Sequence, residues 1–237
     1  MAVIKKTMKV TDVIDETPDT RTIRMDSGEF DFKPGQFVMI NVECEVDGEK
    51  KLVKRAYSIS SPPTKKGYID LTVKIYDVGL VSKKLYEMRV GDEFEVSGPY
   101  GHFTFDESLH KNIVLIGGGV GVTPLMCMAE YIKDKELDIN VDLIYSSKTP
   151  NDIIFKERIM KNGHKKTKVH LTITRPEGHE WEGITGRINE EMIKNIVKDL
   201  RLPYYFLCGP TMMVEETAKL LKNMGINHEK IKLERFG

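Results

Sequence analysis

The chain has 237 residues, of which 40% are apolar and 30% are charged, and its 36 basic residues balance its 36 acidic residues. This length predicts one or two domains with a sizeable core, and the zero formal charge does not favour nucleic acid or an anionic membrane as a partner. Cys44, Cys127 and Cys208 lie too far apart in sequence for a CxxC zinc site or a locally spaced iron–sulfur cluster, so no metal site is expected.

Targeting and membrane signals are weak throughout the sequence. No apolar run approaches the roughly 20 residues that cross a bilayer. Residues 1–15 contain lysines but lack the apolar stretch of a signal peptide. We therefore expect a cytoplasmic protein without a membrane span.

The first part of the chain is predicted to form an antiparallel β-barrel. Short segments rich in β-branched or aromatic residues are separated by turn signals such as Lys33-Pro34-Gly35. One helix is expected at residues 82–88, with Ser82 as its N-cap. The expected strands are residues 8–14, 20–25, 37–42, 55–59, 69–74 and 93–97.

Beyond about residue 108 strands alternate with helices, which predicts a parallel sheet with helices on both faces. We place the boundary within residues 105–111, so that the domains are residues 1–108 and 109–237. The expected strands are 113–116, 141–145, 169–174, 204–207 and 231–233, and the expected helices are 124–133, 151–160, 189–197 and 211–224.

A glycine-rich turn follows the first strand of the parallel sheet and precedes a helix. Pro124 suits the first helical position and Thr123 suits the cap before it. Glycines let a backbone approach a pyrophosphate at a helix N-terminus, where free N–H groups favour negative charge. The Walker lysine is missing, and the spacing is not GxGxxG. The alternative is a turn that serves only tight packing of strand on helix.

Two further segments combine chemically useful side chains. Cys208-Gly209-Pro210 places a thiol at the carboxyl end of a buried strand, where open parallel sheets bind ligands; the alternative is a small buried residue. Residues 55–60 end a barrel strand with a cation, an aromatic ring and two hydroxyls; the alternative is an ordinary exposed strand.

Taken together and in order, these segments resemble the ferredoxin–NADP reductase superfamily of two-domain flavoenzymes, and the resemblance covers nearly the whole chain. The resemblance implies an antiparallel Greek-key β-barrel that binds flavin and a parallel α/β domain that binds a nicotinamide nucleotide. Its motifs are Arg55-x-Tyr57-Ser58, Gly79-Leu80-Val81-Ser82, Gly98-Pro99-Tyr100-Gly101, residues 117–124, Cys208-Gly209-Pro210 and Glu234-Arg235-Phe236.

The resemblance implies a flavin site on the barrel. Arg55 would pair with the flavin pyrophosphate, to which its guanidinium fork is suited. Tyr57 would pack on the isoalloxazine ring, with the Ser58 hydroxyl near flavin N5. Lys74 would border the adenine half. Backbone N–H groups and a hydroxyl at the start of the helix, from Gly79, Leu80, Val81 and Ser82, would bind the pyrophosphate. The combination implies tightly bound FAD.

The second domain, by the same resemblance, would bind NAD(P)H. Cys208 would lie beside the nicotinamide C4, with Glu234 positioning this group or relaying a proton and Phe236 stacking over the flavin. The catalytic candidates are thus Ser58, Cys208, Glu234 and Phe236. The nucleotide-binding candidates are Gly118, Gly119, Val120, Gly121, Thr123, Pro124, Cys208, Gly209 and Pro210.

Two strand ends bear on the choice between NADPH and NADH. The second parallel strand ends at Ser147-Lys148 without an acid, and the third ends at Thr174-Arg175. Relatives place a hydroxyl and an arginine at the third strand end, on the 2′-phosphate. We therefore favour NADPH, with NADH also accepted. The alternative is that Lys148 and Arg175 are solvated loop residues.

The resemblance implies an NAD(P)H-dependent FAD reductase that passes electrons to an external acceptor, because the sequence contains no iron–sulfur or haem domain. The partner would be a separate electron-acceptor protein or a small molecule. Two alternatives remain open: an electron-transfer subunit that is active only within a larger complex, and a free-flavin reductase.

Overall fold

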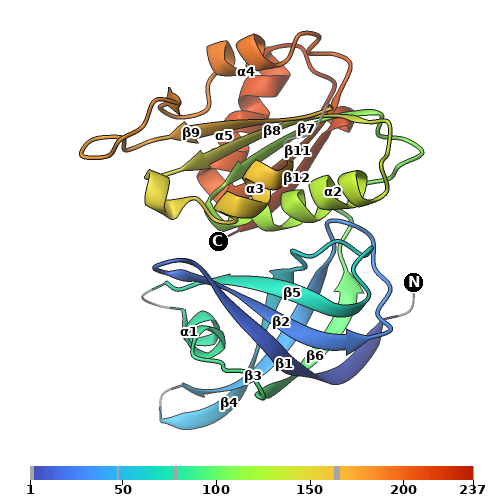
Figure 1. Ribbon diagram of the computed structural model, residues 1–237, viewed down its shortest axis with the longest axis vertical. Helices are drawn as coiled ribbons and strands as arrows, with labels where there is room; N and C mark the ends of the chain where they lie inside the picture. Colours follow the sequence, from blue (N-terminus) through green and yellow to red (C-terminus); the bar gives the residue numbers. More distant parts are fainter. Residues whose placement is uncertain (1–2, 47, 77–78, 163–165, 237) are drawn as a thin grey trace. The chain divides into compact units, whose positions relative to one another are not determined.

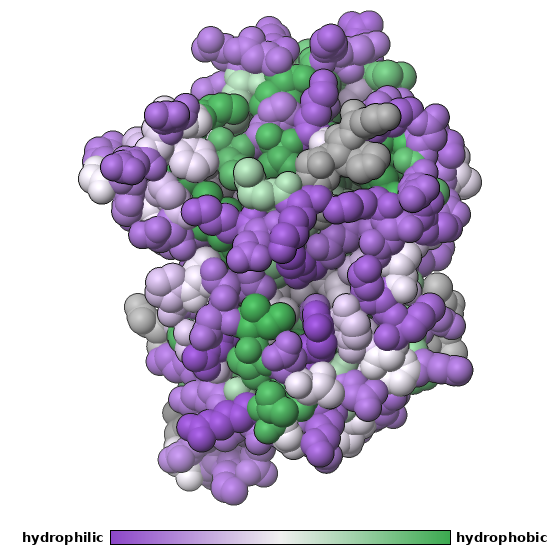
Figure 2. Space-filling model, viewed as in Figure 1, coloured by the Kyte–Doolittle hydropathy of each residue, from purple (hydrophilic) through white to green (hydrophobic). Residues whose placement is uncertain are grey.

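The computed structural model describes residues 3–46, 48–76, 79–162 and 166–236. The chain divides into two compact units, Met1–Thr104 and Phe105–Gly237, and each unit is considered by itself (Figure 1). Hydrophilic side chains cover most of the face that Figure 2 shows, with smaller apolar areas between them. No helix in the described ranges is long and apolar enough to cross a membrane.

The first unit is an antiparallel sheet with the strand order β4-β3-β6-β1-β2-β5. Its two edge strands meet, because Ile59 bridges to Leu71 and the N–H of Ser60 donates to the carbonyl of Asp70 at 2.9 Å. The predicted barrel is thereby confirmed. Its strands are β1 (Ile4–Thr17), β2 (Thr20–Gly28), β3 (Phe37–Val46), β4 (Glu49–Ser58), β5 (Gly67–Lys74) and β6 (Glu93–Tyr100).

Alternation of apolar residues along these strands fills the barrel. Residues two apart on one strand face the same side of a sheet, and pairs such as Val38 and Ile40 on β3 or Ile69 and Leu71 on β5 are fully buried. Helix α1 (Leu80–Tyr86) buries Val81 and contacts β3, β4 and β5. The barrel is therefore a rigid support for the residues at the ends of β4 and β5.

The second unit is a parallel sheet with the strand order β10-β9-β8-β7-β11-β12, as predicted. Figure 1 shows α2 and α3 on one side of this sheet and α4 and α5 on the other. Its strands are β7 (Asn112–Gly118), β8 (Asn140–Ser147), β9 (Thr167–Ile173), β10 (Ile184–Thr185), β11 (Tyr204–Pro210) and β12 (Ile231–Phe236). Its helices are α2 (Val122–Asp134), α3 (Lys156–Asn162), α4 (Glu190–Ile196) and α5 (Thr211–Asn223), with 3-10 turns η1 (Gly119–Gly121), η2 (Pro150–Asp152) and η3 (His228–Lys230).

The core on the α4 and α5 face combines sheet and helix residues. Ile116 and Ile144 of the sheet pack in one cluster with Ile193 of α4 and with Val214 and Leu221 of α5. The other face of the sheet, toward α2, receives the alternate residues of the same strands, such as Leu115 and Leu143, which are fully buried. Both faces being covered explains the nearly continuous apolar sequence of these strands.

One predicted helix, residues 151–160, is wrong in its extent. Residues 151–160 were expected to be one helix, but the structure has the turn η2 and then α3, which begins only at Lys156. Between them Ile153, Ile154 and Phe155 are buried, and Phe155 has a positive φ of 59°. Three consecutive residues of a helix point in different directions, so one face of a helix cannot bury all three of these side chains. The chain therefore leaves the helical conformation at residues 153–155.

Candidate functional site

The order of the parallel sheet reverses between β7 and β11. Strands β8, β9 and β10 lie on one side of β7, and β11 and β12 lie on the other. Ligands of open α/β sheets bind at the carboxyl ends of the strands where the order reverses. Here those two ends carry the glycine turn after β7 and the segment Cys208-Gly209-Pro210, and Gly117 is in register with Cys208. Two separately predicted motifs thus meet at one edge.

The two turns touch backbone to backbone, which explains the glycines at Gly121 and Gly209. A Cβ atom at Gly121 would overlap the carbonyl of Cys208 and the Cα atom of Gly209. A Cβ atom at Gly209 would come within 2.9 Å of the carbonyl oxygen of Gly118. Gly119 differs: it has a positive φ of 53°, and a Cβ atom there would have no atom of the described residues within 4 Å apart from its chain neighbours. Space beside the turn is therefore open at Gly119.

Backbone N–H groups gather where the glycine turn becomes a helix. The turn η1 passes directly into α2, and no side chain in the described part of the chain caps either start. The first N–H groups of such a helix, those of Gly119 and Val120, have no helical acceptor. They form a positively polarised edge that suits a phosphate.

Thr123 is not the helix cap that its sequence context predicts. It lies inside the first turn of α2, whose N-cap is Gly121, and its hydroxyl donates to the carbonyl of Val120 at 3.0 Å. Pro124 accordingly occupies the third helical position and not the first. Both side chains are buried, so the glycine turn presents mainly backbone to its surroundings.

Cys208 and Glu234 are neighbours in register on β11 and β12, and Pro210 is in register with Phe236. Cys208 is fully buried. Burial raises the pKa of the Cys208 thiol well above its usual range, and the charge of Glu234 adds to this effect. Burial also raises the pKa of Glu234, which the charge of Arg235 partly offsets. The site therefore holds a neutral thiol next to a carboxyl group that binds a proton more readily than usual.

The ends of β8 and β9, on which the predicted preference for NADPH depends, lie side by side. The N–H of Thr174 donates to the carbonyl of Ser147 at 3.0 Å, and the N–H of Arg175 donates to the carbonyl of Lys148 at 2.8 Å. Both cationic side chains are exposed. The Ser147 hydroxyl is buried and has no hydrogen-bond partner within the described ranges. A buried, unpaired hydroxyl is costly, which suits a position completed by a ligand.

On the barrel, Arg55, Tyr57 and Ser58 lie at the end of β4. Arg55 and Tyr57 are two apart and so project from the same face of the strand. The Arg55 guanidinium is exposed and donates to the carbonyl of Lys54 at 2.8 Å. Tyr57 is partly buried; burial raises its pKa to about 12, although the charge of Arg55 acts in the opposite direction. Ser58 is buried.

The helix predicted at residues 82–88 is present as α1, but it begins two residues earlier and has a different N-cap. Gly79, and not Ser82, is the N-cap. The Ser82 hydroxyl instead bonds back to the carbonyl of Gly79 at 3.0 Å, and a Cβ atom at Gly79 would overlap that hydroxyl. Among the residues that the structure describes, which exclude 77–78, no side chain caps the N–H groups of the first turn, at Leu80 and Val81. This part of the barrel therefore resembles the glycine turn of the second unit in offering backbone donors.

Lys74, at the end of β5, is held by an acidic neighbour. Its ammonium donates to Asp19. Burial raises the pKa of Asp19, but the hydrogen bonds from Lys74, Thr17 and Thr20 outweigh burial and lower it overall. Lys74 is thus a fixed cation and not a flexible one.

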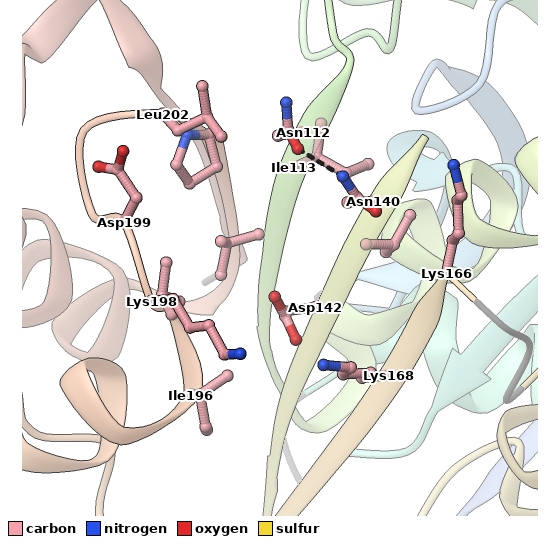
Figure 3. A pocket seen from close by; sticks show the side chains of 14 residues that line it. Asn112, Ile113, Asn140, Asp142, Lys166, Lys168, Ile196, Lys198, Asp199 and Leu202 are labelled. Atoms are coloured by element: carbon pink, nitrogen blue, oxygen red, sulfur yellow. Dashed lines mark hydrogen bonds between the residues drawn. The ribbon is translucent and has the colours of Figure 1, made fainter. Parts of the chain in front are cut away.

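A cavity of about 320 Å³ lies at the opposite, amino-terminal edge of the parallel sheet (Figure 3). It is lined by the first residues of β7 and β8, by Lys166 and Lys168, and by the loop that follows α4. Figure 3 shows Lys168 and Lys198 extending toward Asp142, whose carboxylate is 3.0 Å from His170. None of the predicted site residues lines this cavity. Within the described residues, no group of His, Cys, Asp and Glu is arranged to hold a metal ion.

Sequence reasoning missed one residue at the switch point. Met213, in the first turn of α5, packs on Gly118 and Gly209. The signal for it in the sequence is only its position, three residues after Pro210 in a predicted helix.

The comparisons with known proteins agree with this geometry. Residues 7–105 match the model of the oxidoreductase FAD-binding domain, and residues 115–219 match that of the oxidoreductase NAD-binding domain. The chain is 35% identical over 233 residues to the glycine betaine monooxygenase reductase subunit of Chromohalobacter salexigens, covering 95% of this chain and 62% of that protein. It is 31% identical to the NADH-cytochrome b5 reductase-like protein of Arabidopsis thaliana, covering 78% of this chain and 61% of that protein.

A solved structure shows the same fold. The ferredoxin reductase in carbazole 1,9a-dioxygenase superposes with a TM-score of 0.87 at 26% identity, covering 100% of this chain and 70% of that one. The chain spans a little over three fifths of the length of the two curated relatives.

Proposed function

We propose a reductase activity for this chain, which belongs to the ferredoxin–NADP reductase superfamily: FAD-dependent transfer of hydride from NAD(P)H, with delivery of electrons to an external acceptor. The observation that carries the proposal is the meeting of the glycine turn and Cys208-Gly209-Pro210 at the β7/β11 switch point. Nucleotides bind at this place in open α/β sheets.

The residues present fit both cofactors. For the nucleotide, the open backbone at Gly119 and the unpaired buried hydroxyl of Ser147 are suited to a phosphate and to a polar group of the ligand. For FAD, the exposed Arg55 guanidinium and the uncapped start of α1 supply donors for a pyrophosphate. We accordingly assign FAD binding to residues 1–108 and NAD(P)H binding to residues 109–237.

FAD, when bound, accepts two electrons as hydride and releases them singly or together. The chain's own contribution is binding and orientation. We assign the backbone of Gly118, Gly119, Val120 and Gly121 to the dinucleotide phosphates, with Thr123 and Pro124 supporting this turn from the buried side. We assign Cys208, Gly209 and Pro210 to the nicotinamide edge. The neutral thiol of Cys208 would give the nicotinamide a small, uncharged neighbour, and beside it lies the carboxyl group of Glu234, whose pKa burial raises.

On the barrel we assign Arg55 to the flavin pyrophosphate together with Gly79, Leu80, Val81 and Ser82. Tyr57 and Ser58 would contact the flavin ring, as would Phe236 from the end of β12. Lys74 would border the adenine half, with its ammonium oriented by Asp19.

We propose NADPH as the preferred donor, with NADH also accepted. Hydrogen bonds between the ends of β8 and β9 bring Lys148 and Arg175 to one corner of the sheet. Two exposed cations there suit a 2′-phosphate, and no acid occupies either strand end to accept ribose hydroxyls and repel that phosphate.

The acceptor would be a separate redox protein or a small molecule. Two relatives support this by name, since one is a reductase subunit of a monooxygenase and the other is related to cytochrome b5 reductases. The chain matches only part of each relative, so an electron-transfer subunit that works within a larger complex remains the second candidate, and a free-flavin reductase the third.

Anaerobic rapid mixing separates these candidates. The purified chain should carry FAD, and its visible flavin absorbance should bleach on addition of NADPH without any partner. A chain that binds FAD but is not bleached supports the subunit within a complex. A colourless chain that reduces only added flavin supports the free-flavin reductase. A panel of electron acceptors then measures which of them reoxidises the flavin.

We also propose that the protein acts in the cytoplasm. NAD(P)H is generated there, and Cys44 and Cys208 are buried thiols outside any disulfide, as is common in reducing compartments. Cell fractionation with an antibody to the chain tests this location.

A further inference from the structure

Met213 occupies the space beside the two glycine turns at the switch point. It is the third residue of α5, and it is partly buried. A Cβ atom built on Gly118 would overlap the Met213 sulfur and lie 3.2 Å from its methyl carbon. A Cβ atom built on Gly209 would lie 2.9 Å from that same methyl carbon. One thioether therefore packs against the Cα atoms of both turns.

The type of side chain suits this position. Methionine is unbranched and polarizable, and it adapts its shape to fill irregular gaps. Here the gap lies between two backbones that carry no side chains of their own, at Gly118 and Gly209. Removing the thioether would leave the backbone contact between the two turns but empty the space beside Gly118 and Gly209, because neither glycine has a side chain to fill it.

We propose that Met213 is a positioning residue: its thioether fixes the glycine turn after β7 relative to the turn after β11, and so sets the backbone donors for the dinucleotide. This role rests on the proposed function, since it acts through the N–H groups of Gly119 and Val120. Met213 itself need not touch the nucleotide. The consequence is that nucleotide affinity depends on how much of the time the two turns hold the binding geometry.

The first test compares two adjacent methionines. Met213→Ala should weaken NADP⁺ binding roughly three- to tenfold, because a turn that is competent for only part of the time lowers the apparent affinity by that fraction. The turnover number should change less than the Michaelis constant. Met213→Leu, which roughly conserves volume, should restore most of the affinity. Met212→Ala is the matched control, because Met212 is 73% exposed one position earlier in the helix.

The second test is a double-mutant cycle that detects the contact itself. Gly118 has an extended backbone, with φ −137° and ψ 130°, so alanine is sterically allowed there apart from Met213. The next nearest atom to its Cβ would be Pro210 Cδ at 3.5 Å, an ordinary contact. Gly118→Ala alone should therefore lower the melting temperature and weaken NADP⁺ binding, and Met213→Ala should relieve both defects in the double variant.

The outcomes separate the proposal from the function on which it rests. If Gly118→Ala lowers the melting temperature by the same amount in the wild type and in the Met213→Ala variant, the packing role of Met213 is overturned. A Met213→Ala variant that melts lower yet binds NADP⁺ as the wild type does would overturn the positioning role. Absence of NADP⁺ and NAD⁺ binding in the wild type would instead contradict the proposed function, while the melting temperatures of the cycle would still report the contact.

Discussion

Replacing Arg175 by alanine should weaken the use of NADPH far more than the use of NADH. The Arg175 side chain is exposed, while its backbone N–H is held by the carbonyl of Lys148 at 2.8 Å. The substitution therefore removes a guanidinium and leaves the strand ends joined. Only NADPH carries the 2′-phosphate that a guanidinium can bind with two parallel hydrogen bonds.

The magnitude follows from the exposure of the site. Hydrogen bonds to charged groups contribute about 1.5–3 kcal/mol, and each 1.4 kcal/mol is about tenfold in affinity. Water competes at an exposed guanidinium, so the lower half of that range applies. We expect kcat/KM for NADPH to fall roughly ten- to thirtyfold, mostly through KM, and kcat/KM for NADH to change less than about threefold.

Steady-state reduction of ferricyanide, measured with each nucleotide, provides the assay. Lys198→Ala is the control, because Lys198 is another exposed cation of the same unit, at the cavity on the opposite edge of the sheet. Thr174→Asp should act in the same direction by another route, lowering NADPH use by repulsion of the phosphate while NADH use persists. Equal losses with the two nucleotides in Arg175→Ala, or a wild type that uses NADH alone, would refute the reasoning.

Three further predictions concern the barrel, the thiol and a buried histidine. Arg55→Ala should weaken FAD binding about ten- to a hundredfold through loss of a charge-assisted contact, as measured by flavin retention on ultrafiltration; unchanged retention would contradict this. Cys208→Ala should slow flavin reduction by NADPH in stopped flow with FAD still bound, and the native thiol should resist alkylation at neutral pH because burial raises its pKa; rapid alkylation would contradict that. Burial lowers the pKa of His110, whose Nδ1 accepts the N–H of Asp106 at 2.9 Å. The unfolded chain then takes up a proton near pH 6.5 that the folded chain resists, so stability should fall as pH drops below about 6.5. His110→Gln should flatten this dependence in urea unfolding, and an unchanged slope would exclude the histidine.

Patterns that depend on local periodicity were readable from the sequence. The alternation of apolar runs with amphipathic segments predicted the parallel sheet, and Asn189 caps α4 by accepting the N–H of Met192 at 2.9 Å, at the start expected for that helix. The strand β4 was predicted too short. Its first residues form an exposed hairpin that includes Lys50 and Lys51, and their charges hide the alternation that packing would otherwise impose.

The helix starts show why the remaining details were out of reach. Sequence preference assigns the caps to Ser82 and Thr123, since their hydroxyls commonly accept N–H groups. In the structure both hydroxyls donate to the carbonyl three residues earlier, at Gly79 and Val120, and glycines take the cap positions. That choice depends on close approach of other backbone segments, as at Gly121 against Cys208. A contact between residues so distant in sequence leaves no local signature.

The pairing of β7 with β11 also constrains when the nucleotide site can come into existence. Ile113 of β7 is in register with Val141 of β8 on one side. On its other side it is in register with Tyr204 of β11, which follows it by 91 positions in the sequence. Closing so long a loop is entropically costly and slow. During synthesis, the glycine turn must wait for residues 204–237 to leave the ribosome before its partner turn can dock. A chain that is truncated before Tyr204 would therefore keep the glycine turn but lack the strand and the turn with which it pairs.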